Sequence, residues 1–317
     1  MTLTGDDLIL LEYAAELPLA GCLYACRGLF HAADYARESS PLAMRQAAGG
    51  AVIELAFQRF LSEHGIPFDQ EAVTPFTTPE HASLVLGGRL CQVVPIINDH
   101  PVGVNQASRQ VYLEESRLPQ FKEQGLPDVH EDEELLVYAA LSWLPRAKKA
   151  RETAETTPQN GQEMLVHALP ASWAQPQPWA SLGEMRVKSG CAGPLKLRLD
   201  GQNDQRQYQT ETLSLLAGEQ QIILPGFYAL GTLRTEHHPT GRTEIRRKGA
   251  KQAYVVYPHQ WAALWHPGNQ ITLLGYLTWG EARRMTPNLP GTHVPLTQLH
   301  ALPEMFERVK QWAQRSG

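Results

Sequence analysis

The chain has 317 residues, of which 43% are hydrophobic and 19% are charged, and its formal net charge is −5. This composition excludes an intrinsically disordered chain and predicts one large or two modest globular domains. The charge is unevenly placed, because residues 1–150 carry 20 acids and 11 bases (net −9), whereas residues 151–317 carry 13 acids and 17 bases (net +4). The second half is therefore the better candidate for a surface that binds a polyanion.

The N-terminal segment and the cysteines favour a cytoplasmic protein. Asp6 and Asp7 stand where a signal peptide would have basic residues, and no apolar run reaches the roughly 18 residues of a spanning helix. The four cysteines are too few and too scattered for a disulfide scaffold. We expect no membrane partner.

Three helical stretches are predicted before residue 65. Caps and early acids predict a helix over residues 8–16 that ends at Pro18, and a second stretch runs from Tyr24 to about Tyr35. A longer helix follows over residues 44–64, and apolar residues cover nearly its whole circumference. We therefore expect this last helix to be buried.

Glu54 is the only charged residue between Arg45 and Arg59 of the long helix. A carboxylate with apolar neighbours is costly unless it is paired, hydrogen-bonded or bound to a metal. Beyond the helix, residues 83–86 and 89–97 are separated by two glycines and predict a hairpin with a two-residue turn. Residues 135–141 form an apolar run typical of a central strand.

The helix and hairpin, over residues 44–94, resemble the core of the PD-(D/E)XK nuclease superfamily, the restriction-endonuclease-like fold. That family has a glutamate on the helix, an aspartate that opens a strand, a tight turn, and a second strand that ends in Asp/Glu-x-Lys. Glu54 matches the helix glutamate. Ser83 takes the place of the metal-binding aspartate, Gln92 that of the second acid and Val94 that of the lysine. The resemblance implies an α/β fold with a mixed sheet flanked by helices.

The same positions argue against the family's reaction. Phosphodiester hydrolysis of this kind needs a divalent cation held by carboxylate oxygens and a group that positions water. Ser83 and Gln92 are neutral, and Val94 cannot orient a nucleophile. We therefore expect a catalytically inactive site without a cofactor or metal. Mg²⁺ would be needed only in a divergent nuclease that combines Glu54 with other acids, such as Asp69, Glu71 or Glu80.

The chain between residues 156 and 251 predicts a different structure. Residues 156–182 read as a linker and extended chain that contains Pro170, Pro176 and Pro178. Short alternating runs separated by turn signals follow, at residues 184–188, 195–199, 210–216, 220–224, 226–236, 243–247 and 253–257. This spacing predicts a small β-sandwich or barrel, inserted into a nuclease-like domain formed by residues 1–155 and 252–317.

A basic stretch over residues 232–251 is the most distinctive feature of this insert. Its candidate nucleic-acid-binding residues are Arg234, Arg242, Arg246, Arg247, Lys248 and Lys251. A two-stranded ribbon with these bases could follow a phosphate backbone, whereas the alternative is a solvated loop without a specific role. His237 and His238 are adjacent, so on a strand they would point to opposite faces and make a poor metal pair.

The last segment returns to core-like sequence. Residues 270–277 predict a strand, residues 279–284 a helix, and residues 302–314 an amphipathic helix.

The leading hypothesis is an inactive nuclease-fold protein that binds nucleic acid or a protein partner. The resemblance implies a place in a mobile-element or defence complex. A divergent metal-dependent nuclease and a structural subunit without a nucleic-acid role are the alternatives. The ordinary interpretation of residues 44–94 is an unrelated α/β domain with a satisfied buried glutamate.

Overall fold

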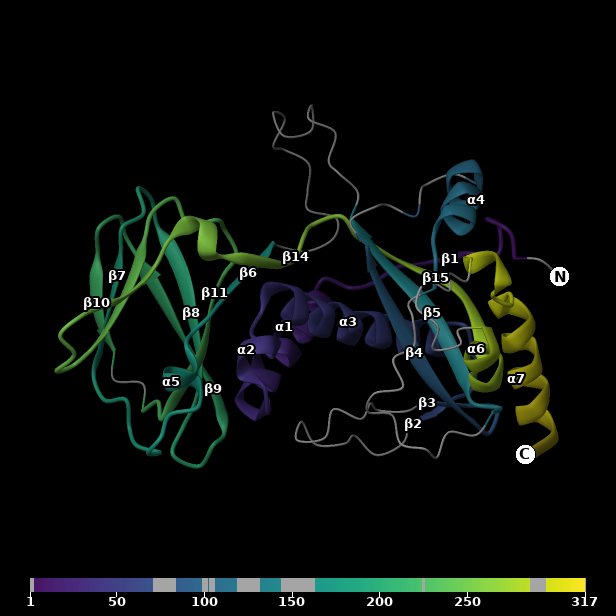
Figure 1. Ribbon diagram of the computed structural model, residues 1–317, viewed down its shortest axis with the longest axis horizontal. Coiled ribbons are helices and arrows are strands. Elements are labelled where there is room, and N and C mark those ends of the chain that lie inside the picture. The colour runs from purple at the N-terminus through teal and green to yellow at the C-terminus, as the bar shows by residue number, and fades with distance from the viewer. Residues whose placement is uncertain are drawn as a thin grey trace. The chain divides into compact units, whose positions relative to one another are not determined.

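The protein contains two compact units in the computed structural model (Figure 1). The structure describes residues 3–70, 84–98, 102, 106–118, 132–143, 163–223, 226–285 and 295–316. One unit, the mixed-sheet unit, consists of residues 1–17, 50–157 and 268–317. The other, the sandwich unit, consists of residues 18–49 and 158–267. The fold is therefore mixed α/β, with one mixed sheet and two antiparallel sheets flanked by helices.

Six strands form the sheet of the mixed-sheet unit, in the order β1-β15-β5-β4-β3-β2. Their bounds are Ile9–Leu11 (β1), Asp69–Gln70 (β2), Leu84–Leu86 (β3), Arg89–Asn98 (β4), Leu135–Trp143 (β5) and Asn269–Thr278 (β15). β4 and β5 are parallel, and the other neighbouring pairs are antiparallel. Helix α4 (Gln106–Glu115) lies between β4 and β5 in the chain, because a parallel pair needs a crossover connection.

Different helices cover the two faces of this sheet. On one face, Tyr138 of β5 shares a hydrophobic core with Leu113 of α4 and Trp279 of α6 (Trp279–Met285). On the other face, α3 (Pro41–Glu63) approaches β4 closely, so that a Cβ added at Gly50 would lie 3.6 Å from Cγ of Pro95. The sheet is thus buried on both sides, which explains its long apolar strands.

Helix α7 (Leu302–Ser316) packs against α3 and the β3–β4 turn. The ring of Phe306 lies 6.4 Å from that of Phe57 and 5.7 Å from that of Phe60, measured between centroids. At the turn, Gly88 has a φ of 74°, and a Cβ there would meet the Trp312 ring at 3.1 Å. The turn therefore needs glycine both for its backbone conformation and for its contact with α7.

Two antiparallel sheets form the sandwich unit, in the orders β10-β7-β12-β13 and β14-β6-β11-β8-β9 (Figure 1). Their strands are Met164–Ala168 (β6), Met185–Ser189 (β7), Leu195–Gln202 (β8), Tyr208–Leu215 (β9), Gln220–Ile223 (β10), Ala229–Thr235 (β11), Thr243–Arg247 (β12), Tyr254–Val256 (β13) and Ala262–Trp265 (β14). Alternate residues of both sheets share one core, which includes Val187, Ile245, Leu199 and Leu233. A short helix, α5 (Ala171–Ala174), follows β6.

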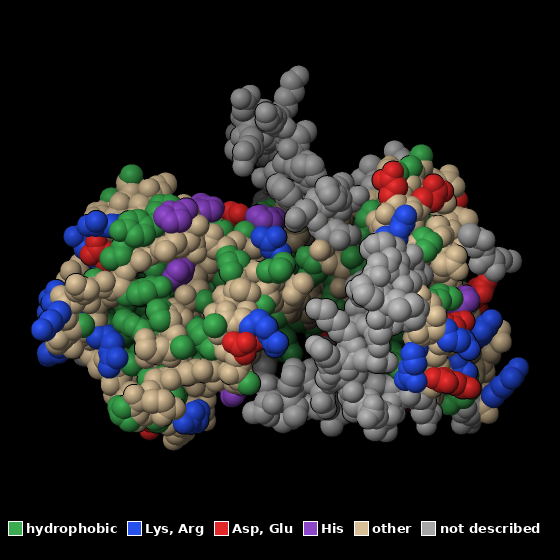
Figure 2. Space-filling model, viewed as in Figure 1, with side chains coloured by type: hydrophobic (Ala, Val, Ile, Leu, Met, Phe, Trp, Pro, Cys, Tyr) green, Lys and Arg blue, Asp and Glu red, His purple; other side chains and the backbone are tan. Residues whose placement is uncertain are grey.

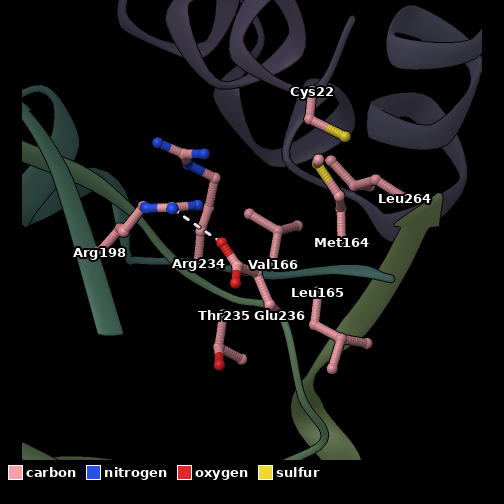
Figure 3. Close-up of a pocket in the computed structure, with 9 residues that line it drawn as sticks. All are labelled: Cys22, Met164, Leu165, Val166, Arg198, Arg234, Thr235, Glu236 and Leu264. Carbon is pink, nitrogen blue, oxygen red and sulfur yellow. Dashed lines mark ion pairs between the residues drawn. The ribbon is translucent and has the colours of Figure 1, made fainter. Parts of the chain in front are cut away.

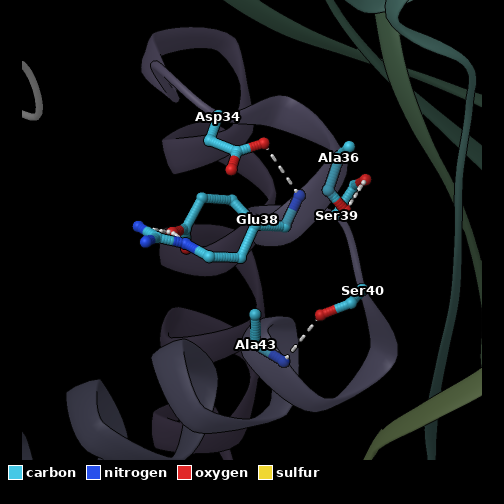
Figure 4. A network of polar contacts seen from close by, with 7 residues as sticks. Asp34, Ala36, Glu38, Ser39, Ser40 and Ala43 are labelled. Carbon is cyan, nitrogen blue, oxygen red and sulfur yellow. Dashed lines mark hydrogen bonds and ion pairs between the residues drawn. The ribbon is translucent and has the colours of Figure 1, made fainter.

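Short polar caps fix the helical segments of the sandwich unit (Figure 4). α1 (Glu16–Gly28) leads into a 3₁₀ turn (Leu29–His31) and then α2 (Tyr35–Glu38). Asp34 accepts a hydrogen bond from the Arg37 amide at 3.2 Å, and Ser40 Oγ accepts one from the Ala43 amide at 3.3 Å. Each cap satisfies an amide that has no partner within its helix.

The helix expected at residues 8–16 is wrong. Residues Ile9–Leu11 form strand β1, in which Ile9 lies opposite Leu273 of β15, and the first helix begins only at Glu16. Pro18 lies in the first turn of this helix instead of ending it, because amides in that turn need no intrahelical acceptor. Strand pairing has overridden the local helix signal.

The expected hairpin, central strand and C-terminal helix are present as β3–β4, β5 and α7. The short strands of the second half also form, with bounds within a few residues of the predicted ones. Strands β6 and β14 and helix α5 were not predicted. β6 lies entirely inside residues 156–182, for which the sequence predicts a linker and extended chain.

Candidate functional site

Glu54 lies on α3, half-buried, against the first strand of the parallel pair. Burial raises the pKa of its carboxyl above the ordinary value. The side chain of Gln58 donates a hydrogen bond to Glu54 Oε1 at 3.5 Å. Burial raises the pKa of the Cys91 thiol on β4, and the nearby charge of Glu54 raises it further. Glu54 therefore faces a protonated thiol across the helix–sheet contact.

The strand register separates Glu54 from the other two described positions of the proposed nuclease site. Because side chains alternate along a strand, Cys91 and Val93 share the face that α3 covers. Val94 instead packs in the core on the opposite face, and Gln92 has the same parity as Val94. The structure therefore does not bring Gln92 and Val94 together with Glu54. The expected site positions, Gln92 and Val94, are each one residue away from the residues that face α3. Sequence spacing alone does not show which face of the sheet a strand residue occupies.

Asp69 is the one further acid of the divergent-nuclease alternative that lies among the described residues, and it does not join Glu54. Asp69 lies opposite Val85, which in turn lies opposite Leu90 of β4. Leu90 is on the same side of the sheet as Gln92, so the side chain of Asp69 is on the face away from α3. Ser83, Glu71 and Glu80 lie outside the described residues. In the part of the chain that is described, no group of three or more His, Cys, Asp or Glu side chains is arranged as a metal site.

The basic stretch does not form a two-stranded ribbon. β11 belongs to the five-stranded sheet and β12 to the four-stranded sheet, so the chain between them crosses from one layer of the sandwich to the other. Arg234 on β11 and Arg246 on β12 consequently lie on different sheets. The expected ribbon was wrong because two consecutive strands need not pair when the connection changes layer.

Arg234 is buried in an ion pair instead of lying at the surface. Its guanidinium binds Asp200 through two hydrogen bonds, one from Nε and one from Nη2 at 2.8 Å. Thr210 and Thr232 donate to the same carboxylate at 2.7 and 3.0 Å. Burial alone would raise the pKa of Asp200, but Arg234 and the hydrogen bond from Thr210 hold it below its ordinary value. Arg234 therefore serves this buried network.

The other basic residues lie in two environments around β12. Arg246 is exposed on the outer face of the four-stranded sheet, where its Nε donates to the Ala250 carbonyl at 2.9 Å. Arg247 has the opposite parity, and its guanidinium lies 5.9 Å from the centre of the Trp173 ring. Lys248 and Lys251 are both exposed after the strand. Arg246 and Arg247, adjacent in sequence, thus belong to different surfaces.

The register of the four-stranded sheet adds two basic residues that sequence reasoning missed. Arg186 lies opposite Arg246, and Lys188 lies opposite Glu244, on strand β7. Both are exposed, because their neighbours Met185, Val187 and Ser189 point into the core. The alternation at residues 185–189 could have shown that Arg186 and Lys188 point outward. It could not show that β7 pairs with a strand more than 50 residues away.

We call the outer side of this sheet the basic face, defined by Arg186, Lys188, Arg242, Arg246 and Lys248. Figure 2 shows lysine and arginine side chains along the margin of the sandwich unit where this sheet lies. Two half-buried acids lie among them. Glu244 pairs with Arg242 at 2.7 Å, and Glu184 lies 3.4 Å from Lys248 and 3.7 Å from Arg186. Five cations and two carboxylates leave this face positively charged.

A small cavity in the sandwich unit lies among charged side chains that are already paired (Figure 3). Its lining includes Cys22, Met164, Arg198, Arg234 and Glu236. Arg198 Nη2 and Glu236 Oε1 are paired at 2.7 Å, and Arg234 is held by Asp200. The cavity volume is about 10 Å³, which is the room that one water molecule needs, so the cavity does not suit an organic ligand.

Comparisons with known proteins give this chain no relative: no family model matches it, and no match was found among curated proteins or solved structures. None of the helices that the structure describes is long and apolar enough to cross a membrane.

Proposed function

We propose that this chain is a catalytically inactive nuclease-fold protein that binds nucleic acid through the basic face of its sandwich unit. The basic face carries the proposal. Its cations come from strands β7 and β12 and the adjacent turns, so a rigid sheet holds them in place. Lysine and arginine on such a surface bind phosphates by releasing counterions, without reading sequence.

The arrangement of the mixed-sheet unit supports the nuclease-like part of the proposal. Helix α3 carries Glu54 and is followed by the hairpin β3–β4 and then by β5, which pairs with β4. This is the order of elements that the resemblance to the PD-(D/E)XK superfamily implies. The resemblance rests on layout, because fold alone does not establish activity.

The chemistry around Glu54 supports inactivity. A hard divalent cation needs several oxygen ligands, and the β4 residues on the face that α3 covers, among them Cys91, Val93 and Pro95, carry no side-chain oxygen. A buried thiol with a raised pKa and a valine supply no such oxygen. One carboxylate would leave the cation mostly to water.

A binding and cleavage assay tests this proposal with the full chain. At about 50 mM salt, fluorescence anisotropy with labelled oligonucleotides should show binding that weakens steeply as salt is added. The double variant Arg186→Ala/Arg246→Ala should bind more weakly, with a flatter dependence on salt. The matched control is Arg308→Ala/Arg315→Ala, which removes two exposed arginines from α7. Equal loss in both double variants would contradict a specific role of the basic face.

The same samples, incubated with Mg²⁺ or Mn²⁺, should leave single-stranded and duplex DNA and RNA uncut. Cleavage that is lost in Glu54→Gln would overturn inactivity and favour a divergent nuclease. Absence of binding to every nucleic acid at low salt would overturn the binding function itself.

A further inference from the structure

The outer side of the four-stranded sheet combines its cations with apolar and aromatic side chains in a regular pattern. In the register, Ile222 of β10, Arg186 of β7 and Arg246 of β12 lie across from one another. The next row along the strands contains Lys188, Glu244 and Val255. Same-face neighbours lie about 6.6–6.8 Å apart along a strand and about 4.8 Å apart across strands. The face therefore presents a closely spaced mixture of charged and apolar groups.

Tyr257 extends this pattern at the end of the sheet. Thr243 lies opposite Val256, the last residue of β13, so Tyr257 follows directly after the strand with the outward parity of Val255. Its side chain is 47% exposed. The ring of His259 lies stacked on it, with centroids 5.9 Å apart and an interplanar angle of 13°. An exposed, stacked aromatic pair thus lies at the end of the sheet where Arg242 precedes β12, and the Arg242 side chain is itself 58% exposed.

We propose that the basic face binds single-stranded nucleic acid, with phosphates on Arg186, Lys188 and Arg246 and a base stacked at Tyr257. This inference rests on the proposed function and specifies its ligand. Proteins read duplex DNA with a helix, ribbon or arm that enters a groove, whereas a sheet surface with aromatic residues suits unpaired bases. The exposed Ile222 gives a second apolar contact for a base on the same face.

The charges of the face also fit a strand that contributes both phosphates and bases. In the described part of the chain, neither Lys188 nor Arg246 belongs to an ion pair, so their charges are free to meet phosphates. Glu244 and Glu184 partly neutralise Arg242, Arg186 and Lys248. A face of such moderate charge gains from stacking, which each base offers irrespective of sequence.

The experiment compares four labelled probes on the full chain by fluorescence anisotropy. They are an oligothymidylate of about 20 nucleotides, a duplex of equal length, an abasic strand with the same number of phosphates, and polyglutamate. We expect the oligothymidylate to bind at least about tenfold more tightly than the other three, because only it offers unpaired bases together with phosphates.

Two sets of variants separate stacking from charge. Tyr257→Ala should weaken oligothymidylate binding by about 5-fold to about 100-fold, with an unchanged salt slope, because stacking releases no counterions. Tyr257→Phe should retain binding. Arg186→Ala/Arg246→Ala should instead flatten the slope by about 1.4, at about 0.7 for each phosphate contact on a single strand. Tyr24→Ala is the matched control, because Tyr24 on α1 is 45% exposed.

Several results would overturn the inference while leaving the proposed function in place. These are equal or tighter binding of the duplex, equal binding of the abasic strand, or a Tyr257→Ala variant that binds like Tyr24→Ala. Preferential binding of polyglutamate would indicate an acidic protein partner and contradict both proposals. Absence of binding to all four probes at about 50 mM salt would overturn the proposed function and this inference together.

Discussion

The carboxylates of Asp200, which is buried, and Glu54, which is half-buried, have pKa values shifted in opposite directions, because they have different hydrogen-bond and charge partners. Asp200 accepts hydrogen bonds from Arg234, Thr210 and Thr232, and Arg234 and Thr210 hold its pKa below the ordinary value despite burial. Glu54 has one long hydrogen bond from Gln58, and burial raises its pKa. A paired charge therefore stabilises the sandwich unit, whereas the charge of Glu54 is a cost to the mixed-sheet unit.

The cost at Glu54 predicts a pH-dependent effect of Glu54→Gln on stability. A carboxyl with a raised folded pKa contributes fully to stability below its unfolded pKa, and this contribution is lost as pH rises through the folded pKa. Thermal melting should therefore favour the variant over the wild type more at about pH 8 than at about pH 4. The control is Glu63→Gln, at an exposed position on the same helix. An equal difference in melting temperature between Glu54→Gln and the wild type at both pH values would contradict the prediction.

The residue scale also shows how far the sequence could predict the candidate site. The sequence marked Glu54 and the basic stretch, because an isolated acid in an apolar helix and a cluster of bases are both visible in one dimension. It could not separate Arg246 from Arg247, or Gln92 from Cys91, because the face of a strand residue depends on which side the core lies. Nor could it bring Arg186 to Arg246, which requires the pairing of β7 with β12.

At the scale of elements, local patterns predicted most strands, and pairing decided the exceptions. Alternating burial made the strands of the second half recognisable, as in the buried–exposed pattern of β7. β1 was missed because its three residues follow a good helix-capping sequence, and only its pairing with β15 makes it a strand. The sheet to which β11 or β12 belongs is a tertiary choice that no local pattern contains.

Two glycines in different elements predict opposite effects of the same substitution. Gly50→Ala in α3 should stabilise the protein by up to about 1 kcal/mol, because alanine favours helix and the new Cβ meets Pro95 at an ordinary 3.6 Å. Gly201→Ala in β8 should destabilise it by about 1–3 kcal/mol, since its Cβ would overlap the Ala229 carbonyl and the Phe227 ring. Urea denaturation measures both. Equal signs for the two variants would show that the local packing is not as described.

At the scale of the whole molecule, each unit has a hydrophobic core of its own. The sandwich core draws its buried residues from strands of both antiparallel sheets. The mixed-sheet core described above gathers residues from β5, β15, α4 and α6. Helix α3 belongs to both units, since the division falls between residues 49 and 50. Two cores in one chain allow two cooperative transitions instead of a single one.

Calorimetry with one variant in each core tests this organisation. Asp200→Asn leaves the buried Arg234 without its counter-charge and should cost the sandwich unit about 3–5 kcal/mol. Phe57→Ala removes a fully buried ring from α3 and should cost the mixed-sheet unit about the same, roughly 3–5 kcal/mol. Each variant should lower the midpoint of a different transition and leave the other in place, because each lies in a different core. The two expected losses are of similar size, so the two shifts can be compared directly. If both variants lower one shared transition equally, the two cores unfold as a single cooperative structure, and α3 is the element through which their stabilities would be coupled.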